Sequence, residues 1–248
     1  MTNVADNTLK NRFIEEIKHK IISGEWGPGK KLPGERDLAK EMGLSRTLVN
    51  NALFEMSSQG FIKMVPRAGN YVVDIQKEGT LDVLSSVMNY NSDQISLALF
   101  DDMMDTRLLI ERECTSRAIH NATEEDFCKM EKNIDDMKTA TNTDQFCEAV
   151  FRFHFNLIQA SKNAIYMMIY RGFEPALKCL MWNHYSKGKT DRSEYICLHQ
   201  NLLDALRVKD ESRADEYIQL ILRIGINVLR KKYERKDKSE EVKKYEKV

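Results

Sequence analysis

The segment from residue 30 to residue 73 restricts the possible folds more than any other part of this chain. It contains two short amphipathic helical patterns separated by a glycine, followed by two short strand-like runs. Pro33 precedes an acidic start to the first helix, and both features suit a helix N-terminus. Gly43 provides a flexible corner between the helices, and Ser45 is a favourable N-cap for the second. The order helix, turn, helix, hairpin predicts a winged helix-turn-helix.

The apolar residues of both helices recur at helical spacing. We expect the buried positions to be Leu38, Ala39 and Met42 in the first helix and Val49, Ala52, Leu53 and Met56 in the second. Residues 61–65 and 70–73 resemble the two strands of a hairpin, whose tip contains Arg67 and Gly69. An amphipathic helix at residues 9–23 is expected to pack behind this unit.

The second helix leaves polar side chains free near its N-terminus. With the apolar positions buried, Arg46, Thr47 and Asn50 project from the opposite side. This end of a recognition helix enters the major groove of DNA, where arginine can bind guanine and asparagine can bind adenine. The alternative is that Arg46 and Asn50 are ordinary solvated residues, which the order of the surrounding elements disfavours. The predicted DNA-contacting residues are Arg36, Ser45, Arg46, Thr47, Asn50, Arg67 and Gly69.

Three short motifs occur here in a fixed order: Pro28-Gly29, Leu32–Arg36 (Leu-Pro-Gly-Glu-Arg) and Ser45-Arg46. With these motifs, residues 9–75 resemble the DNA-binding domain of GntR-type bacterial transcription regulators. The resemblance implies a homodimer that binds double-stranded DNA at a palindromic operator. The family commonly has arginine in place of Asn50, and its hairpin often reads Gly-x-Gly where this chain has Arg-Ala-Gly. We therefore expect an operator that differs from the usual one.

The composition changes after the polar joint at residues 76–79, where Met-rich and Leu-rich helical patterns begin. We place a winged helix-turn-helix domain at residues 1–76, an all-α bundle at residues 77–233 and a charged tail at residues 234–248. The tail is either a frayed helical extension or a disordered segment. The expected fold is therefore mainly α, with one small β-hairpin. Lys and Arg number 38 and Asp and Glu also number 38, so net charge gives no sign of nucleic-acid binding, and the motif is the evidence for it.

Helical spacing continues through most of the second half. A short helix is expected from Leu81, and Ser92 is the expected cap of a long one that includes Ile95. Thr123 and Asp126 suggest a capping box. The remaining helices are expected near residues 124–139, 144–161, 164–183, 192–208 and 211–233, with an interruption at Gly172 and Pro175.

Cysteine usage and hydropathy bear on the compartment. The five cysteines form no Cys-x-x-Cys pair, as expected of reduced thiols in a cytosolic protein. The first residues lack an apolar signal core, and no run approaches the ~20 apolar residues of a membrane span. We expect a cytoplasmic protein without a membrane partner.

The second half also contains family-like motifs, among them Asp105–Arg107, Phe153-His154 and Asp204–Leu206. They resemble the ligand-sensing helical domain of the FadR subgroup. In many relatives this domain holds a divalent metal through an Asp four residues before a His, that His, a second His, and a third His 22 residues later. The corresponding residues here are Val150, His154, His199 and Ile221. Because only two of the four ligands remain, we expect no metal and no other cofactor.

Three roles remain open for His154 and His199: polar anchors for an organic effector, hydrogen-bonded core residues, or metal ligands. Arg107 could bind an acidic ligand or form a salt bridge with Asp105 or Glu111. Apolar walls for the effector pocket could come from Tyr166, Met167, Met168, Tyr170 and Trp182. The alternative is that they belong to the plain core, as a stripe of methionine and aromatic residues more often does.

The sequence thus predicts a DNA-binding transcription regulator, a repressor, whose operator affinity responds to a small acidic metabolite. The effector pocket would contain Arg107, His154 and His199. A metal-responsive regulator of the same architecture is the alternative. An enzyme that uses His154 or His199 as a base is disfavoured, because no nucleophile and base with a third orienting residue is visible.

Overall fold

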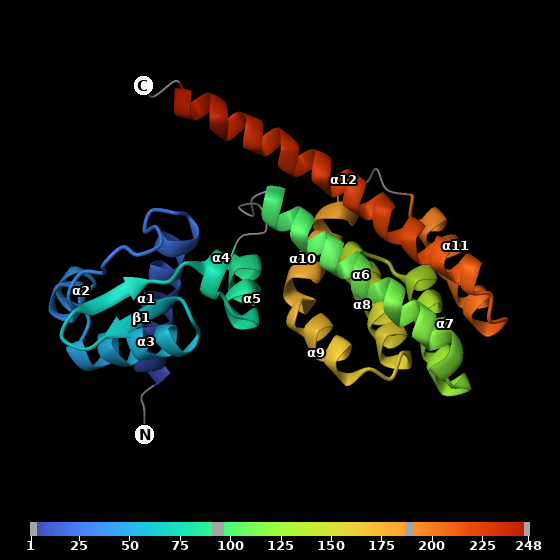
Figure 1. The fold of residues 1–248 in the computed structure, drawn as a ribbon, viewed down its shortest axis with the longest axis horizontal. Coiled ribbons are helices and arrows are strands. Elements are labelled where there is room, and N and C mark those ends of the chain that lie inside the picture. The colour runs from blue at the N-terminus through green and yellow to red at the C-terminus, as the bar shows by residue number, and fades with distance from the viewer. Residues whose placement is uncertain (1–3, 91–96, 187–190, 246–248) are drawn as a thin grey trace. The chain divides into compact units, whose positions relative to one another are not determined.

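The computed structural model describes residues 4–90, 97–186 and 191–245. The chain divides into two compact units, Met1–Gln94 and Ile95–Val248 (Figure 1). The first contains a small hairpin among helices, and the second is helical throughout its described part. The prediction of a mainly α fold is confirmed.

The N-terminal unit is a winged helix-turn-helix, as predicted. Its elements are α1 (Val4–Ile22), α2 (Glu35–Glu41), α3 (Arg46–Ser58), β1 (Ile62–Val65), β2 (Gly69–Val72), α4 (Ile75–Glu78) and α5 (Leu81–Tyr90). The corner between α2 and α3 contains Gly43 at φ +64°, a left-handed conformation that glycine adopts without steric cost. Ser45 then caps α3, since its side chain accepts a hydrogen bond from the backbone N–H of Leu48 at 3.2 Å.

The core of this unit is formed by apolar faces that the periodicity predicted. Phe13 and Ile17 of α1 are buried together with Leu38 and Ala39 of α2. Met42 is only partly buried, because α2 ends at Glu41. The four inward positions expected for α3, namely Val49, Ala52, Leu53 and Met56, are all fully buried.

The boundary between the units lies further along the chain than the sequence indicated. Val83 of α5 is fully buried within the N-terminal core, and Ile75 and Val87 pack against the same cluster. Helices α4 and α5 therefore belong to the first unit, and the division falls after Gln94 instead of after residue 76. The change in composition at residues 76–79 falls at α4, after the hairpin has ended at Val72. It does not mark the unit boundary, because the core contacts of α5 are tertiary and leave no local signal in the sequence.

The hairpin is antiparallel and pairs Lys63 with Tyr71 and Val65 with Gly69. Lys31 pairs with Tyr71 from the other side as an isolated bridge. At the tip, Arg67 has φ 62°, and the Tyr71 hydroxyl donates to the backbone carbonyl of Ala68 at 3.3 Å. These contacts hold the hairpin tip in a defined conformation.

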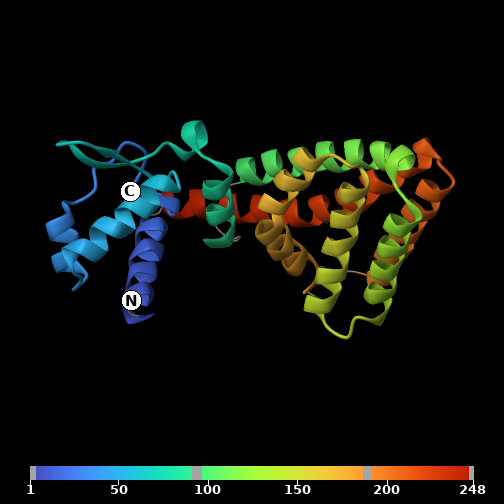
Figure 2. The same cartoon turned by 90° about the horizontal axis from the view of Figure 1, so that it is seen from below.

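The C-terminal unit is an α-helical bundle. Its helices are α6 (Leu97–Asn121), α7 (Glu124–Thr139), α8 (Thr143–Ala160), α9 (Ala164–Gly172), α10 (Glu174–Tyr185), α11 (Arg192–Arg207) and α12 (Glu211–Tyr245). Helices α6 and α12 lie side by side, and α7 packs against α8 (Figures 1 and 2). In the described part, no helix is long and apolar enough to cross a membrane.

Local signals placed most of these helices correctly. The predicted interruption at Gly172 and Pro175 is the boundary between α9 and α10. The capping box is present, because Thr123 and Asp126 each bond the other's backbone N–H. Helix α12 continues through most of the expected charged tail, to Tyr245. The predicted cap at residue 92 and the apolar position at residue 95 lie outside the described residues.

Candidate DNA-binding face and effector cavity

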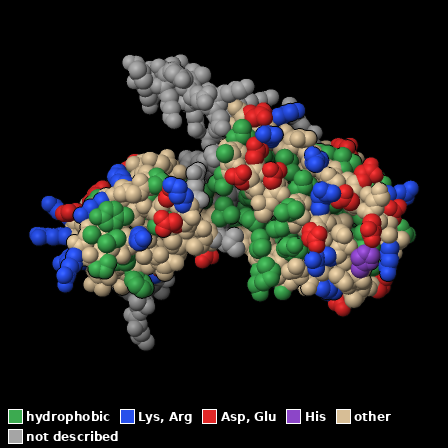
Figure 3. Space-filling view, viewed as in Figure 1, with side chains coloured by type: hydrophobic (Ala, Val, Ile, Leu, Met, Phe, Trp, Pro, Cys, Tyr) green, Lys and Arg blue, Asp and Glu red, His purple; other side chains and the backbone are tan. Residues whose placement is uncertain are grey.

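The N-terminal end of α3 presents the side chains that were predicted to contact DNA. Arg46, Thr47 and Asn50 are exposed, as is Arg36 on the neighbouring helix α2. Lysine and arginine side chains gather at the left end of this unit (Figure 3). The exposed face therefore combines groups that can contact bases with groups that can contact phosphates.

Asn50 has a partner that the sequence analysis did not identify. Its Nδ2 donates a hydrogen bond to Oε1 of Glu35 at 2.9 Å. Glu35 begins α2, and the bond links the two helices of the helix-turn-helix. The Leu-Pro-Gly-Glu-Arg motif contains this residue, but no local pattern shows that it reaches α3.

The hairpin adds a cation that the sequence analysis also missed. Gly69 has φ +116°, and a Cβ built on it would lie 2.9 Å from Cε of Lys31. The Lys31 side chain thus lies against the hairpin that contains Arg67. The backbone angle explains why a glycine is favoured at position 69, whereas the flexible end of Lys31 could move away from a Cβ.

The core of the second unit contains a chain of buried polar side chains. Arg107 Nε donates to Oε1 of Glu111 at 2.6 Å, and Oε2 of Glu111 lies 2.5 Å from Nδ1 of His154. His154 Nε2 in turn lies 3.3 Å from Nε2 of His199, whose Nδ1 is 2.6 Å from the backbone oxygen of Tyr195. Glu111 and His199 are 0% exposed and His154 is 1% exposed. Of the two salt bridges considered for Arg107, the structure shows the one to Glu111.

Charges within this chain stabilise each other. Burial alone would raise the pKa of Glu111, but Arg107 and His154 together lower it to about 2. Burial would likewise lower the pKa of Arg107, yet Glu111 keeps it raised. For His199, burial and the neighbouring His154 lower the pKa to about 3. Glu111 is therefore a carboxylate and His199 is a neutral imidazole at neutral pH.

Hydrogen bonds at both ends of this chain fix two ring hydrogens. The Glu111 carboxylate and the Tyr195 carbonyl both accept, so the Nδ1 atoms of His154 and His199 each carry a hydrogen. The Nε2 atoms of the two rings face each other at 3.3 Å.

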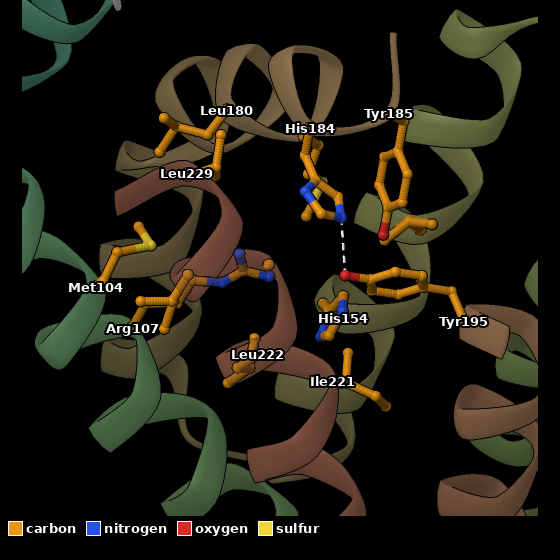
Figure 4. Close-up of a pocket in the computed structure, with 14 residues that line it drawn as sticks. Met104, Arg107, His154, Leu180, His184, Tyr185, Tyr195, Ile221, Leu222 and Leu229 are labelled. Carbon is orange, nitrogen blue, oxygen red and sulfur yellow. Dashed lines mark hydrogen bonds between the residues drawn. The ribbon is translucent and has the colours of Figure 1, made fainter. Parts of the chain in front are cut away.

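A cavity lies beside this chain, between helices α6, α8, α10, α11 and α12. Arg107, His154, His184 and Tyr195 point toward its centre, and Leu180 and Leu229 lie at one side (Figure 4). His184 Nε2 is 2.7 Å from the Tyr195 hydroxyl. Burial lowers the pKa of His184 to about 4. The cavity is thus mostly apolar with a few convergent polar groups, which is typical of small-molecule sites.

The cavity is small. The centres of water-sized molecules can occupy a volume of ≈ 40 Å³ inside it. One bound water needs about 10–15 Å³ of such space, so the cavity has room for about three water molecules. A ligand that fits this conformation has few heavy atoms.

Of the two interpretations of the methionine and aromatic residues, the pocket wall was wrong, and plain core holds for Tyr170. None of the five residues proposed for them lines the cavity. Met168 and Trp182 are 64% and 48% exposed, and Tyr170 is buried in an aromatic stack with Phe151. The apolar lining is instead formed by Met104, Val150, Leu180, Met181, Ile221, Leu222, Ile226 and Leu229.

Comparison with known proteins assigns both halves of the chain. Residues 9–72 match the bacterial regulatory proteins of the gntR family, and residues 102–223 match the FCD domain. The chain belongs to the GntR family. As a GntR-family protein it is a DNA-binding transcription regulator and not an enzyme.

Relatives extend over most of the chain. The Galactonate operon transcriptional repressor of Escherichia coli K12 is 24% identical over 210 residues, which cover 83% of this chain and 90% of that protein. The Uxu operon transcriptional regulator of the same strain is 26% identical over 205 residues, which cover 80% and 77%.

Solved structures support the fold. The structure titled "Lar controls the expression of the Listeria monocytogenes agr system and mediates virulence" has a TM-score of 0.64 at 18% identity and covers 95% of this chain and 99% of that one. A GntR family member from Pseudomonas syringae pv. tomato has a TM-score of 0.51 at 19% identity and covers 95% and 90%.

The metal site of many relatives fits this GntR-family chain poorly. Val150 and Ile221, which stand where the relatives have metal ligands, line the same cavity as His154. Their side chains have no donor atoms for a metal. Glu111 cannot replace them, because it bonds Nδ1 of His154, on the ring edge opposite Nε2. Among the described residues, no group of three or more His, Cys, Asp or Glu side chains converges. Two imidazoles alone leave a divalent ion short of ligands and of negative charge.

Proposed function

We propose that this GntR-family regulator is a repressor whose operator affinity changes when a small organic acid occupies the cavity of the C-terminal unit. The observation that supports the proposal most directly is the convergence of Arg107, His154, His184 and Tyr195 in an otherwise apolar cavity. Such a site binds a ligand with a short apolar part and a polar head.

Charge favours an anionic head. Arg107 lines the cavity, and its Nε–H is bonded to Glu111. A guanidinium has further N–H donors, and its charge-assisted hydrogen bonds to carboxylates are strong. The name of the galactonate operon repressor also refers to an organic acid. We therefore propose a monocarboxylate as the effector, with Arg107 as the charged donor to its oxygens.

The proposal includes no tightly held metal. Elemental analysis of protein purified without chelators would then find no stoichiometric zinc, nickel or manganese. One tightly bound ion per chain would contradict this part of the proposal and favour a metal-responsive regulator.

The proposal extends to assembly and DNA. One recognition helix reads only a half-site, so we propose a homodimer that binds a palindromic operator in the cytoplasm. The effector changes operator affinity only if it binds one dimer conformation more tightly than the other. A gel shift on the promoter region of the chain's own gene tests the DNA-binding step.

The effector proposal is tested by thermal shift and calorimetry with a panel of short monocarboxylates, each paired with its uncharged amide. We expect the acid to stabilise the protein and the amide to have little effect, because only the acid can form a charge-assisted hydrogen bond with Arg107. The same acid should change the affinity for operator DNA in the gel shift. Equal stabilisation by acid and amide would refute the role of charge.

A matched pair of variants locates the site. Tyr195→Phe removes one hydroxyl from the cavity and keeps the ring, and should weaken acid binding by about 2- to 10-fold, the range of one neutral hydrogen bond. Tyr217 does not line the cavity, so Tyr217→Phe makes the same chemical change elsewhere and should leave binding unchanged. Equal binding by the two variants would place the ligand outside this cavity.

A further inference from the structure

The reading end of α3 contains a side chain whose orientation is fixed without DNA. Asn50 is exposed, but its Nδ2 is bonded to Oε1 of the half-buried Glu35 at 2.9 Å. The bond connects α3 to the first residue of α2, 15 positions earlier. A residue predicted to contact bases is therefore already held by a neighbouring helix.

The chemistry of Glu35 determines which way the Asn50 amide faces. A carboxylate only accepts hydrogen bonds, whereas an amide has one donor branch and one acceptor branch. Nδ2 must be the branch turned toward Glu35, and Oδ1 is then the branch turned away. A flipped amide would bring two acceptor oxygens together, so Glu35 disfavours that arrangement.

We infer that Asn50, oriented by Glu35, is a specificity-determining residue that accepts a hydrogen bond from an exocyclic amine of a base. In the major groove, adenine N6 and cytosine N4 are donors, whereas guanine O6 and thymine O4 are acceptors. Oδ1 of Asn50 therefore selects adenine or cytosine and rejects guanine and thymine. The second hydrogen of Nδ2 remains compatible with adenine N7, so adenine can form two bonds.

Glu35 acts in this scheme as a positioning residue. Its carboxylate suits the N-terminus of α2, where negative charge is favourable, and the N-cap Gly34 makes no side-chain cap that would compete for that end. If the bond between Asn50 and Glu35 only joined the two helices, its removal would weaken binding to every DNA sequence and leave the sequence preference unchanged.

Selection of bound oligonucleotides from a random pool separates these roles. The full chain would be compared with Asn50→Ala, Glu35→Ala and Glu35→Gln. Asn51→Ala is the matched control, because Asn51 is the adjacent exposed asparagine of α3. Thermal unfolding of each variant reports its stability.

The natural chain should prefer adenine or cytosine over guanine and thymine at one position per half-site, by roughly tenfold or more. Asn50→Ala and Glu35→Ala should both reduce that preference to less than about twofold at the same position and leave the others intact. Glu35→Gln should admit guanine and thymine there, because a glutamine can also donate and so permits the flipped amide. Asn51→Ala should select the same sites as the natural chain.

Two results would overturn the inference. A natural preference for guanine or thymine at the position that Asn50→Ala relaxes would show that the amide has the opposite polarity. An unchanged consensus for both Glu35 variants, with or without uniformly weaker binding, would show that Glu35 does not position Asn50.

Discussion

The buried pair of Arg107 and Glu111 leads to a prediction about stability that distinguishes pairing from simple packing. We expect Arg107→Met to lower the free energy of unfolding by about 3–5 kcal/mol, because it leaves a buried carboxylate without its guanidinium partner. The double variant Arg107→Met/Glu111→Gln removes both charges. It should be more stable than Arg107→Met alone.

The magnitude follows from the pKa of Glu111. Arg107 and His154 lower that pKa from 4.5 to about 2, a difference that corresponds to about 3 kcal/mol of stability at neutral pH. Because the pKa of this acid is depressed in the folded state, its contribution is complete above pH 4.5 and is lost as the pH falls toward 2. The effect of Arg107→Met should accordingly be largest at neutral pH and shrink in acid.

Urea denaturation can measure the free energy of unfolding of the C-terminal unit alone. The chain has 2 tryptophans, Trp26 in the first unit and Trp182 in the second, so a Trp26→Phe background leaves Trp182 fluorescence as a reporter of the bundle. The natural chain, Arg107→Met, Glu111→Gln and the double variant, all in this background, form a double-mutant cycle. Additive costs, with the double variant less stable than either single one, would refute the argument that Arg107 compensates a buried charge.

Three further predictions concern the reading face, the metal positions and pH. Arg46→Ala should cost about 1–3 kcal/mol of DNA affinity and relax one position per half-site, whereas Arg67→Ala should weaken binding to all sequences, as footprinting and titration would show; unchanged affinities for both would contradict the assigned face. The double change Val150→Asp/Ile221→His should create a metal affinity that calorimetry detects, since both positions line the cavity together with His154. A double variant that binds no metal would show that these positions do not correspond to the metal ligands of the relatives. Burial lowers the pKa of His184 from 6.5 to about 4, so the folded state favours the neutral imidazole, and the free energy of unfolding should decrease by about 2 kcal/mol, after allowance for solvent screening, as the pH falls from 6.5 to 4. His184→Gln should remove this pH dependence from a plot of stability against pH, and an unchanged slope would exclude His184 as its cause.

Local signals account for the parts of the fold that the sequence predicted. Gly43 and Ser45 define the corner and the cap of the helix-turn-helix because backbone angle and capping depend on single residues. The four inward positions of α3 follow from helical periodicity. Val83 could not be assigned in this way, since its burial against the N-terminal core depends on how α5 folds back, which no periodic pattern within α5 specifies.

The same distinction explains the effector cavity. Arg107 and Glu111 are four residues apart on one helix, so their pairing was one of two foreseeable outcomes. His184 and Tyr195 were missed because they come from different helices and meet only through tertiary packing. The predicted walls failed because a cluster of methionine and aromatic residues shows that a helix has an apolar face without showing what that face contacts.

Arg107 belongs both to the stability of the bundle and to the proposed recognition of a carboxylate, and these roles oppose each other. Glu111 already bonds one edge of the guanidinium, so an incoming acid must share Arg107 with a carboxylate that the fold needs. Removing Arg107 would abolish ligand binding whether Arg107 contacts the ligand or only stabilises the bundle, because the variant loses both a ligand contact and the partner of a buried charge. Tyr195 lies across the cavity from this pair and has no such charge to compensate, although its hydroxyl is bonded to His184. Weaker acid binding in Tyr195→Phe, with a stability cost no larger than that of one neutral hydrogen bond, about 0.5–1.5 kcal/mol, would therefore assign recognition to the cavity itself, which no substitution of Arg107 can do.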